Sequence, residues 1–433
     1  MNFILNTAQQ IEEILKVVGV SSINDLFKDI PKGILLKEDL KIDRGLSELE
    51  LKDKLREIAN KNKVDFISFL GAGSYNHFVP SIVNHIISRS EFYTAYTPYQ
   101  PEISQGILQS IYEYQTMIAE LTGMDVANAS LYDGASALAE SCIMAVNITK
   151  KNQILMLKSI HPEYREVVKT YCKAHNFEVE EIEDSEIDEK LSEKTAALLV
   201  QNPNFFGCIE DLNKIKKVVH EKNSLLVVAV VEPTSLGLLK SPGSLGADIV
   251  VGEGQSFGNA MNFGGPYLGI MATKDKYKRN LPGRLVGATV DAAGENAFIL
   301  TLQAREQHIR REKASSNICT NEALCALAAA VHLAALGKQG IKELAELNVQ
   351  KAHYLADKLK AAGFSLVFDK PFYNEFVVKV DNAKEFNEKL LKNNIIGGLD
   401  LGQYYPELKN CLLFCVTEVV TKENMDKLIE IIK

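Results

Sequence analysis

A glycine-rich polar loop separates two apolar runs in ADIVVGEGQSFGNAMNFGGPYLGIMAT, residues 247–273. The pattern predicts a strand, a loop and a second strand, and the first two glycines raise the question of dinucleotide binding. The dinucleotide fingerprint needs a third glycine where this chain has Phe257, so direct NAD binding is disfavoured and a purely structural turn is the alternative. No lysine occurs between Lys240 and Lys274. The loop therefore offers no amine that could form an imine with a carbonyl compound.

The segment SLYDGASALAESCIMA, residues 130–145, is suited to an anion. A strand is predicted to end at Tyr132 and a helix to begin at Ser136. Gly134 allows close backbone approach, and the free amides and dipole of a helix N-terminus favour a phosphate. The alternative is that Asp133 is an ordinary helix cap and no ligand binds.

Tyrosine, amide and carboxylate side chains gather in EFYTAYTPYQPEISQG, residues 91–106. Its two prolines argue against a regular helix or strand. Rigid loops with many hydroxyls and amides suit the orientation of a small polar substrate. An interface loop is the alternative, because tyrosine is also enriched at interfaces. The candidate substrate-orienting residues are Tyr96, Tyr99, Gln100, Glu102 and Ser104.

Basic residues surround His308 in AREQHIRREKASSNICTNEAL, residues 304–324. Glu306 and Arg310 have the i, i+4 spacing of a helical ion pair, which favours a solvated or subunit-facing helix surface. His308 is a candidate general base, although the sequence shows no partner for it. Neither the H-E-x-x-H motif of zinc proteases nor the G-x-S-x-G motif of serine hydrolases occurs.

Apolar runs and amphipathic segments alternate from Phe66 onward. Continuous Val, Leu and Ile strands separated by amphipathic helices indicate a mostly parallel sheet covered on both faces. Ligands on such sheets bind at the carboxyl ends of the strands. The predicted strands are QILMLK, TAALLVQN, SLLVVAVV and ADIVV, and the predicted helices are GILQSIYEYQTMIAELTG, EYREVVKTYCKAHN and LNKIKKVVHEKN.

Different patterns mark the two ends of the chain. The first sixty or so residues are predicted to be helical, with Asn6 and Thr7 as a cap and an apolar stripe in LSELELKDKLREIANKN. A long helical region is predicted from about Ala297 to Gly363, followed by the strands FSLVF, NEFVVKV and CLLFCVTE and the helix AKEFNEKLLKNN. We predict a helical arm at 1–64, a large α/β domain at 65–320, and linking helices with a small α+β domain at 321–433.

Composition excludes several classes of protein. Of 433 residues 46% are hydrophobic and 24% are charged, as in ordinary globular proteins. The net charge of -8 and the lack of a basic run argue against a nucleic-acid partner. The seven cysteines are scattered, without the paired spacing of zinc sites. The start lacks a signal-peptide pattern and no apolar run approaches the ~18 residues of a membrane span. We expect a cytoplasmic protein with reduced cysteines and no metal.

Six segments together resemble one family, the glycine-decarboxylating P-protein of the glycine cleavage system. They span almost the whole chain. The family comes as one chain of about twice this length or as two related subunits, and this chain is similar to the first, or alpha, subunit. The segments are SFLGAGSYNHFVP, FYTAYTPYQPEISQG, TGMDVANASLYDG, GEGQSFG with FGGPYLG, REQHIRREKASSNICTNEAL and IIGGLDLGQYYPELKNCLLFCVTE.

The resemblance implies the aminotransferase-like fold of pyridoxal phosphate enzymes, fold type I. It also implies that the beta subunit carries the lysine that binds pyridoxal phosphate in the loop matching residues 249–269. Gln255 or Ser256 stands nearest that position in this chain, and neither side chain forms an imine. With Gly134 and Ser136 they are expected to line a degenerate cofactor pocket.

The implied activity is that of glycine dehydrogenase (aminomethyl-transferring), at the interface of a complex with two alpha and two beta subunits. Pyridoxal phosphate on the beta subunit, not on this chain, forms an imine with glycine and carbon dioxide leaves. The aminomethyl group then passes to the lipoyl arm of H-protein. The expected share of this chain is to orient glycine and to close the pocket. Two alternatives remain open: an independent pyridoxal enzyme that uses Lys240 or Lys274, and a non-catalytic scaffold.

Overall fold

The computed structural model describes residues 6–36, 38, 40–318 and 320–433. The chain divides into two units, Met1–Val64 and Asp65–Lys433. The predicted boundary near residue 320 stays a prediction. Cys319 lies outside the described residues, and the other six cysteines are free thiols.

The first unit contains the helices α1 (Ala8–Val18) and α2 (Glu48–Ala59). Thr7 caps α1 as predicted, since its side chain accepts from the amide of Gln10 and the Gln10 side chain accepts from the amide of Thr7. Ser47 and Glu50 form the same reciprocal cap on α2. Neither helix buries a residue, so the apolar side chains of this unit form no core of their own.

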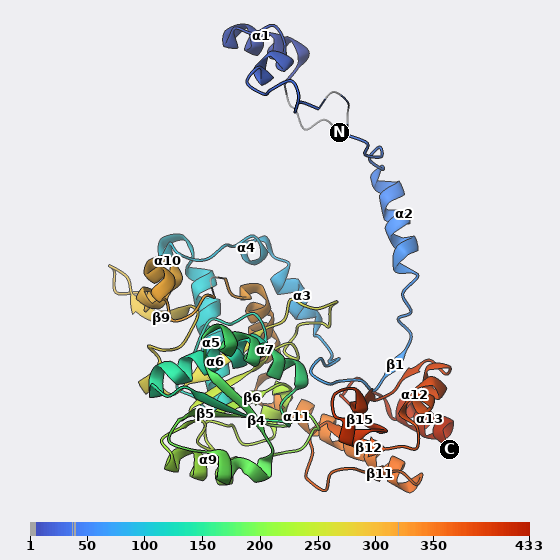
Figure 1. The fold of residues 1–433 in the computed structure, drawn as a ribbon. Helices are drawn as coiled ribbons and strands as arrows, with labels where there is room; N and C mark the ends of the chain where they lie inside the picture. Colours follow the sequence, from blue (N-terminus) through green and yellow to red (C-terminus); the bar gives the residue numbers. More distant parts are fainter. Residues whose placement is uncertain (1–5, 37, 39, 319) are drawn as a thin grey trace. The chain divides into compact units, whose positions relative to one another are not determined.

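A seven-stranded sheet lies at the centre of the second unit (Figure 1). Its strand order is β2-β8-β7-β6-β5-β3-β4, and every pairing from β7 through β4 is parallel. Only β8 runs against its neighbours, so the predicted mostly parallel sheet is confirmed. The strands are β2 (Val126–Ala127), β3 (Gln153–Leu157), β4 (Glu178–Ile182), β5 (Thr195–Gln201), β6 (Leu225–Val230), β7 (Ile249–Glu253) and β8 (Gly269–Thr273).

Helices cover both faces of this sheet because successive side chains of each strand point to opposite sides. Met156 of β3 packs in one core with α6 and α7, and Leu155 packs in another core with α5, α9 and the start of α11. Figure 1 shows α7 and α9 on opposite sides of the strands. The helices are α5 (Gln105–Thr122), α6 (Gly134–Thr149), α7 (Pro162–Ala174) and α9 (Leu212–Glu221), and the short α8 (Ile187–Lys190) follows β4.

The helix α11 (Ala323–Ala361) joins the central sheet to the C-terminal elements. It is kinked at Gly337, which has a φ of 61° that favours glycine. Among the described helices, α11 alone is long and apolar enough to cross a membrane, but 44% of its apolar window is buried within the protein, as in a core helix.

The helical region predicted from Ala297 is wrong at its start. Residues 296–301 form the strand β10 (Asn296–Thr301), which pairs antiparallel with β9 (Leu285–Val290). The apolar stretch FIL can serve either a strand or a helix, and the partner strand β9 decides between them. Among the described residues between β10 and α11, the regular elements are the four-residue helix α10 (Gln307–Arg310) and two short 3-10 turns.

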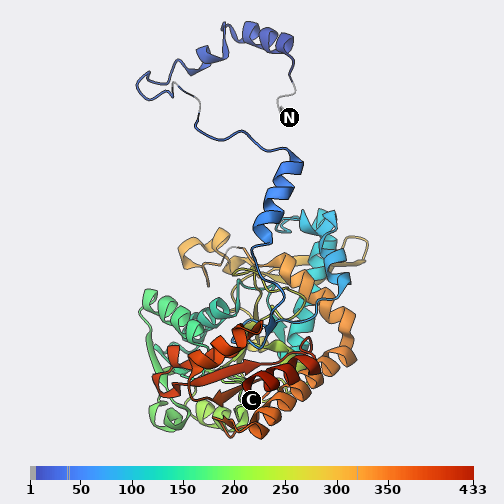
Figure 2. The same cartoon turned by 90° about the vertical axis from the view of Figure 1, so that its right-hand side faces the viewer.

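A small antiparallel sheet of order β11-β12-β15-β14 forms the C-terminal part. The second half of α11 packs with α12 and α13 in the core of this part. The C-terminal elements face the viewer in Figure 2. The strand β1 (Ile67–Ser68) pairs with β13 (Ile395–Ile396), and two short helices, α3 (Ser81–Ile87) and α4 (Ser90–Tyr93), follow β1. The remaining elements are β11 (Ser365–Leu366), β12 (Glu375–Lys379), β14 (Leu399–Asp400), β15 (Cys411–Cys415), α12 (Ala383–Leu391) and α13 (Lys422–Ile432).

Candidate functional site

The N-terminus of α6 lies at the carboxyl end of the sheet and is capped by the chain itself. The Asp133 side chain accepts from the amide of Ser136 at 2.7 Å. The predicted helix start at Ser136 is therefore two residues late, and the cap that the sequence left as an alternative is present.

A second carboxylate, that of Glu253 at the end of β7, also faces this helix. Its Oε2 accepts from the amide of Gly134 at 2.9 Å, and its Oε1 accepts from the amides of Leu268 at 2.9 Å and Gln255 at 3.1 Å. Burial raises the pKa of Glu253 to about 8, against the three amides, which favour the ionised carboxylate. The amide that an external anion would use is thus already occupied.

Gln255 and Ser256, the predicted counterparts of the lysine, are both 2% exposed. The Gln255 side chain accepts from the amide of Tyr75 and donates to its carbonyl oxygen, both at 3.0 Å, and it also donates to the carbonyl oxygen of Asn259 at 2.7 Å. The Ser256 hydroxyl donates to Glu232 at 3.0 Å. Both side chains act as fixed internal hydrogen-bonding groups.

Glu232 also belongs to a buried charged chain. Its Oε2 lies 3.1 Å from Nε2 of His77, whose Nδ1 lies 2.6 Å from Glu418. Burial alone would lower the pKa of His77, but the charges and hydrogen bonds of the two carboxylates raise it to about 10. His332 is also buried, and neither of its ring nitrogens has a hydrogen-bond partner. Burial and the positive charge of His77 lower the pKa of His332 to about 4.

Residues 71–77 pack against this region, since Tyr75 bonds to Gln255 and His77 lies against Glu232. Gly73 has a φ of 98°, and a Cβ there would lie 2.7 Å from the ring of His161. At Gly134 a Cβ would lie 2.5 Å from the hydroxyl of Tyr164 and 3.1 Å from Glu253. The residues present therefore do not fit a pyridoxal phosphate: the loop has no lysine, the amides of Gly134 and Ser136 are paired and the surrounding side chains are packed together.

The two lysines of the independent-enzyme alternative lie elsewhere. Thr273 pairs with Ile249 at the start of β7, so Lys274 lies at the amino edge of the parallel strands, opposite the Glu253 end. Its Nζ is 2.6 Å from Asp248. Lys240 is exposed beyond the 3-10 turn Pro233–Gly237. The geometry therefore does not support either lysine as an anchor in this pocket.

The tyrosine-rich loop borders a cavity of about 260 Å³. The loop is irregular between α4 and the 3-10 turn Pro101–Ile103, as its prolines indicate. Tyr96 is 83% exposed and Tyr99 is 45% exposed. Residues of three regions line the cavity: Phe92 to Pro98, the start of α5 and the start of α11, with Arg284 between them.

Arg284 lines this cavity and was not identified from the sequence. It is 5% exposed, and its guanidinium donates to Oδ1 of Asn321 at 3.0 Å and to the hydroxyl of Tyr99 at 3.2 Å. Its Nε lies 3.9 Å from Glu306. The only signal in the sequence was an arginine directly after a Pro-Gly turn, which many surface arginines share.

The other predicted loop residues are placed differently. Gln100 and Glu102 are exposed, Ser104 is half-buried, and none of the three lines the cavity. Gln105 instead holds the loop, because its side chain donates to the carbonyl oxygens of Pro101 and Phe298 and accepts from the amide of Phe298. The structure thus places Tyr96 in the lining of the cavity and Tyr99 beside it, bonded to Arg284 of the lining. The other three candidates lie outside the lining.

The predicted pairing of Glu306 with Arg310 is wrong. Glu306 precedes α10 and its carboxylate faces Arg284 and His308 instead, at 3.9 and 3.7 Å. The ring of His308 lies 5.7 Å from that of Tyr99. The backbone spacing of one helical turn does form, because the amide of Arg310 donates to the carbonyl oxygen of Glu306 at 2.9 Å, but the Glu306 carboxylate is turned toward Arg284 and His308.

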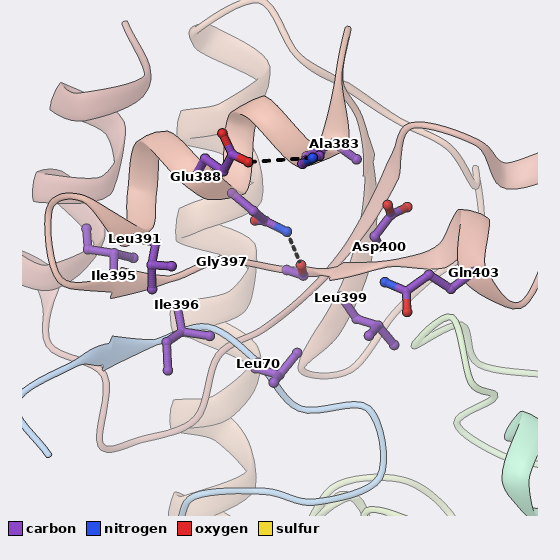
Figure 3. A pocket seen from close by; sticks show the side chains of 13 residues that line it. Leu70, Ala383, Glu388, Leu391, Ile395, Ile396, Gly397, Leu399, Asp400 and Gln403 are labelled. Atoms are coloured by element: carbon purple, nitrogen blue, oxygen red, sulfur yellow. Dashed lines mark hydrogen bonds and ion pairs between the residues drawn. The ribbon is translucent and has the colours of Figure 1, made fainter. Parts of the chain in front are cut away.

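A second cavity, of about 540 Å³, lies between α12 and the strands β13 and β14 (Figure 3). The side chains of Leu70, Leu391, Ile396 and Leu399 line it, and the Asn387 amide donates to the carbonyl oxygen of Gly398 at 2.9 Å. The polar side chains of Glu388, Asp400, Lys384 and Gln403 also line it. The cavity presents a largely apolar surface without a nucleophile. Across the described residues, no three His, Cys, Asp or Glu side chains converge as metal ligands.

Comparisons with known proteins agree over the whole chain. Residues 1–432 match the family model described as glycine cleavage system P-protein. A relative from Desulfitobacterium hafniense, named probable glycine dehydrogenase (decarboxylating) subunit 1, is 57% identical, with 99% of this chain and 98% of the relative aligned. A crystal structure of glycine decarboxylase (P-protein) in inhibitor-bound form has a TM-score of 0.91 at 43% identity, covering 100% of this chain and 99% of that one.

A more distant neighbour shows the fold alone. A sphingosine-1-phosphate lyase of Burkholderia pseudomallei has a TM-score of 0.65 at 14% identity, covering 92% of this chain and 91% of that one. The fold is therefore fold type I of the pyridoxal phosphate enzymes, as the resemblance implied.

Proposed function

Because this chain belongs to the glycine cleavage system P-protein family, we propose that it is the alpha subunit of a cytoplasmic glycine dehydrogenase (decarboxylating). It works with a beta subunit that holds pyridoxal phosphate, in a complex of two alpha and two beta subunits. The complex releases carbon dioxide from glycine and passes the aminomethyl group to the lipoyl arm of H-protein.

The pairing of Glu253 with the amide of Gly134 carries this proposal. Glu253 accepts from an amide at the helix N-terminus, the kind of site at which a phosphate would bind. Gln255 stands nearest the position that the resemblance gives to the partner's lysine, and we infer that the chain needs a partner for its chemistry. A tyrosine loop with exposed hydroxyls remains available for that partner's site. In this proposal the second unit of the chain holds Tyr96 and Tyr99 in position for the partner's site.

In this proposal the chain orients glycine and excludes water from the shared pocket. The hydroxyls of Tyr96 and Tyr99 hold glycine, with Arg284 fixing Tyr99. The neighbouring Gln100, Glu102 and Ser104 complete the wall of the shared pocket. Preorganised polar groups of this kind act on the reacting molecule without reorganising during the reaction.

Reconstitution tests the proposal. The chain is purified alone and together with the partner subunit of the same organism, and glycine-dependent exchange of carbon dioxide is measured with lipoylated H-protein. We expect a stable complex, since shared sites of obligate partners commonly bury more than ~2,000 Å², and activity only in that complex. Activity of the single chain would favour the independent enzyme. Full activity of the partner without this chain would favour the scaffold.

A further inference from the structure

The carboxylate of Glu253 occupies the position that an external anion takes at a helix N-terminus. It accepts from the backbone amides of Gly134, Gln255 and Leu268. Three separate segments of the chain therefore converge on one side chain, which is 2% exposed. None of the ion pairs among the described residues involves Glu253. The amides of the protein are its binding partners, as they are for a bound oxyanion.

The helix itself is well formed for this role. α6 has 16 residues, and the amides of its first turn lack partners within the helix. Asp133 accepts from the amide of Ser136 and Glu253 accepts from the amide of Gly134. An unpaired buried donor costs about 1–3 kcal/mol, so a folded chain without Glu253 needs another acceptor at this position.

We propose that the side chain of Glu253 is a built-in acceptor that takes the place of an external oxyanion at the N-terminus of α6, and that its removal exposes a binding site for a small carboxylate. This role is separate from the proposed catalytic function, because it concerns a pocket closed within this chain. It explains how the backbone amides at the carboxyl end of the sheet find an acceptor without a ligand. A side chain is held at the site by the chain itself, whereas a free ligand stabilises the fold only in proportion to its binding.

Formate is the probe, because it has the size and charge of the carboxylate that is removed. The full-length Glu253→Ala variant is unfolded thermally at pH 9, where the wild-type Glu253, with its pKa of about 8, is ionised. The two solutions are sodium formate and sodium chloride of equal ionic strength. We expect a lower midpoint than wild type in chloride and a formate-dependent rise of about 2–5 °C. Wild type should show no difference between the two salts.

Glu140→Ala is the matched control. Glu140 is also buried, at 3% exposure, and lies in the same helix but not at its N-terminus. This variant should lose stability without recovering it in formate. Glu253→Gln should also ignore formate, because the amide side chain still fills the site.

For a Glu253→Ala chain that is unfolded in chloride, recovery of far-UV circular dichroism on refolding into formate is the equivalent result. Equal midpoints in the two salts, failure to fold in both, or the same formate gain in wild type would overturn the proposal.

Discussion

The guanidinium of Arg284 donates to the hydroxyl oxygen of Tyr99 over 3.2 Å, and its Cζ lies 5.6 Å from the centre of the Tyr99 ring. A buried charge thus fixes an exposed aromatic side chain. Arg165 and Tyr405 have nearly the same geometry elsewhere in the unit, at 3.1 and 5.4 Å. The chain therefore contains its own control for the Arg284 contact.

Arg284→Lys should lower turnover of the assembled complex by roughly ten- to a hundredfold. Lysine keeps the charge but loses the planar fork that reaches Asn321 and Tyr99 together. The measurement is glycine-dependent carbon dioxide exchange, normalised to complex quantified by sedimentation. Arg165→Lys should reduce thermal stability without changing the normalised rate. Equal rates for the two variants would show that the Arg284 contact is structural.

Tyr99→Phe and Tyr96→Phe should each reduce the exchange rate by roughly ten- to a hundredfold, because a hydrogen bond used in the transition state is worth about 1–3 kcal/mol. Their effects on stability should differ. Tyr99→Phe should lower the thermal stability, because it loses the bond from Arg284. Tyr96→Phe should leave the stability unchanged, because the Tyr96 side chain is 83% exposed. Tyr93→Phe is the control, since Tyr93 lines the same cavity without an assigned role. Unchanged rates with weakened assembly would identify an interface loop.

The free energy of unfolding should fall as pH rises because of His77. Its pKa is about 10 in the folded chain, where Glu232 and Glu418 face it, and about 6.5 in an unfolded chain. A raised folded pKa gives stability that is complete below pH 6.5 and is lost as pH rises through 10. The advantage of wild type over His77→Gln should therefore shrink by roughly 3–5 kcal/mol across this interval.

Chemical denaturation at several pH values measures this difference, and His332→Gln provides the comparison. The pKa of His332 is lowered to about 4 by burial and by His77. A lowered histidine pKa costs stability only below about pH 6.5, so the effect of His332→Gln should be flat from pH 7 to 10. A constant difference for His77→Gln over the same range would mean that its charge does not stabilise the fold.

The sequence predicted those parts of the fold that depend on local pattern. Continuous apolar runs identified the central strands, and the Thr7 cap followed from helix chemistry. The stretch at residues 296–301 was misassigned because its hairpin partner, not its own composition, makes it a strand.

The site depends on contacts between distant parts of the chain, which no local pattern contains. Gly134 and Glu253 are 119 residues apart, and Tyr99 and Arg284 are 185 apart. The missing lysine was visible in the sequence, whereas the bond from the amide of Gly134 to Glu253 became visible only in the structure, where the end of β7 meets the start of α6.

Gln255→Lys should not create a cofactor site. Lysine cannot accept from the amide of Tyr75, and its ammonium would be buried among groups that now bind an amide side chain. We expect a loss of stability of roughly 2–4 kcal/mol. Gln255→Met is of similar size but uncharged. It separates the lost hydrogen bonds from the buried charge and should lose less stability.

Cofactor binding is tested separately. Both variants are incubated with pyridoxal phosphate, scanned for aldimine absorbance and reduced with borohydride before peptide mapping. Because Glu253 still pairs with the amide of Gly134, residue 255 should remain unmodified in both. Labelling of the new lysine, together with decarboxylation by the single chain, would show that one amine is enough to restore this pocket.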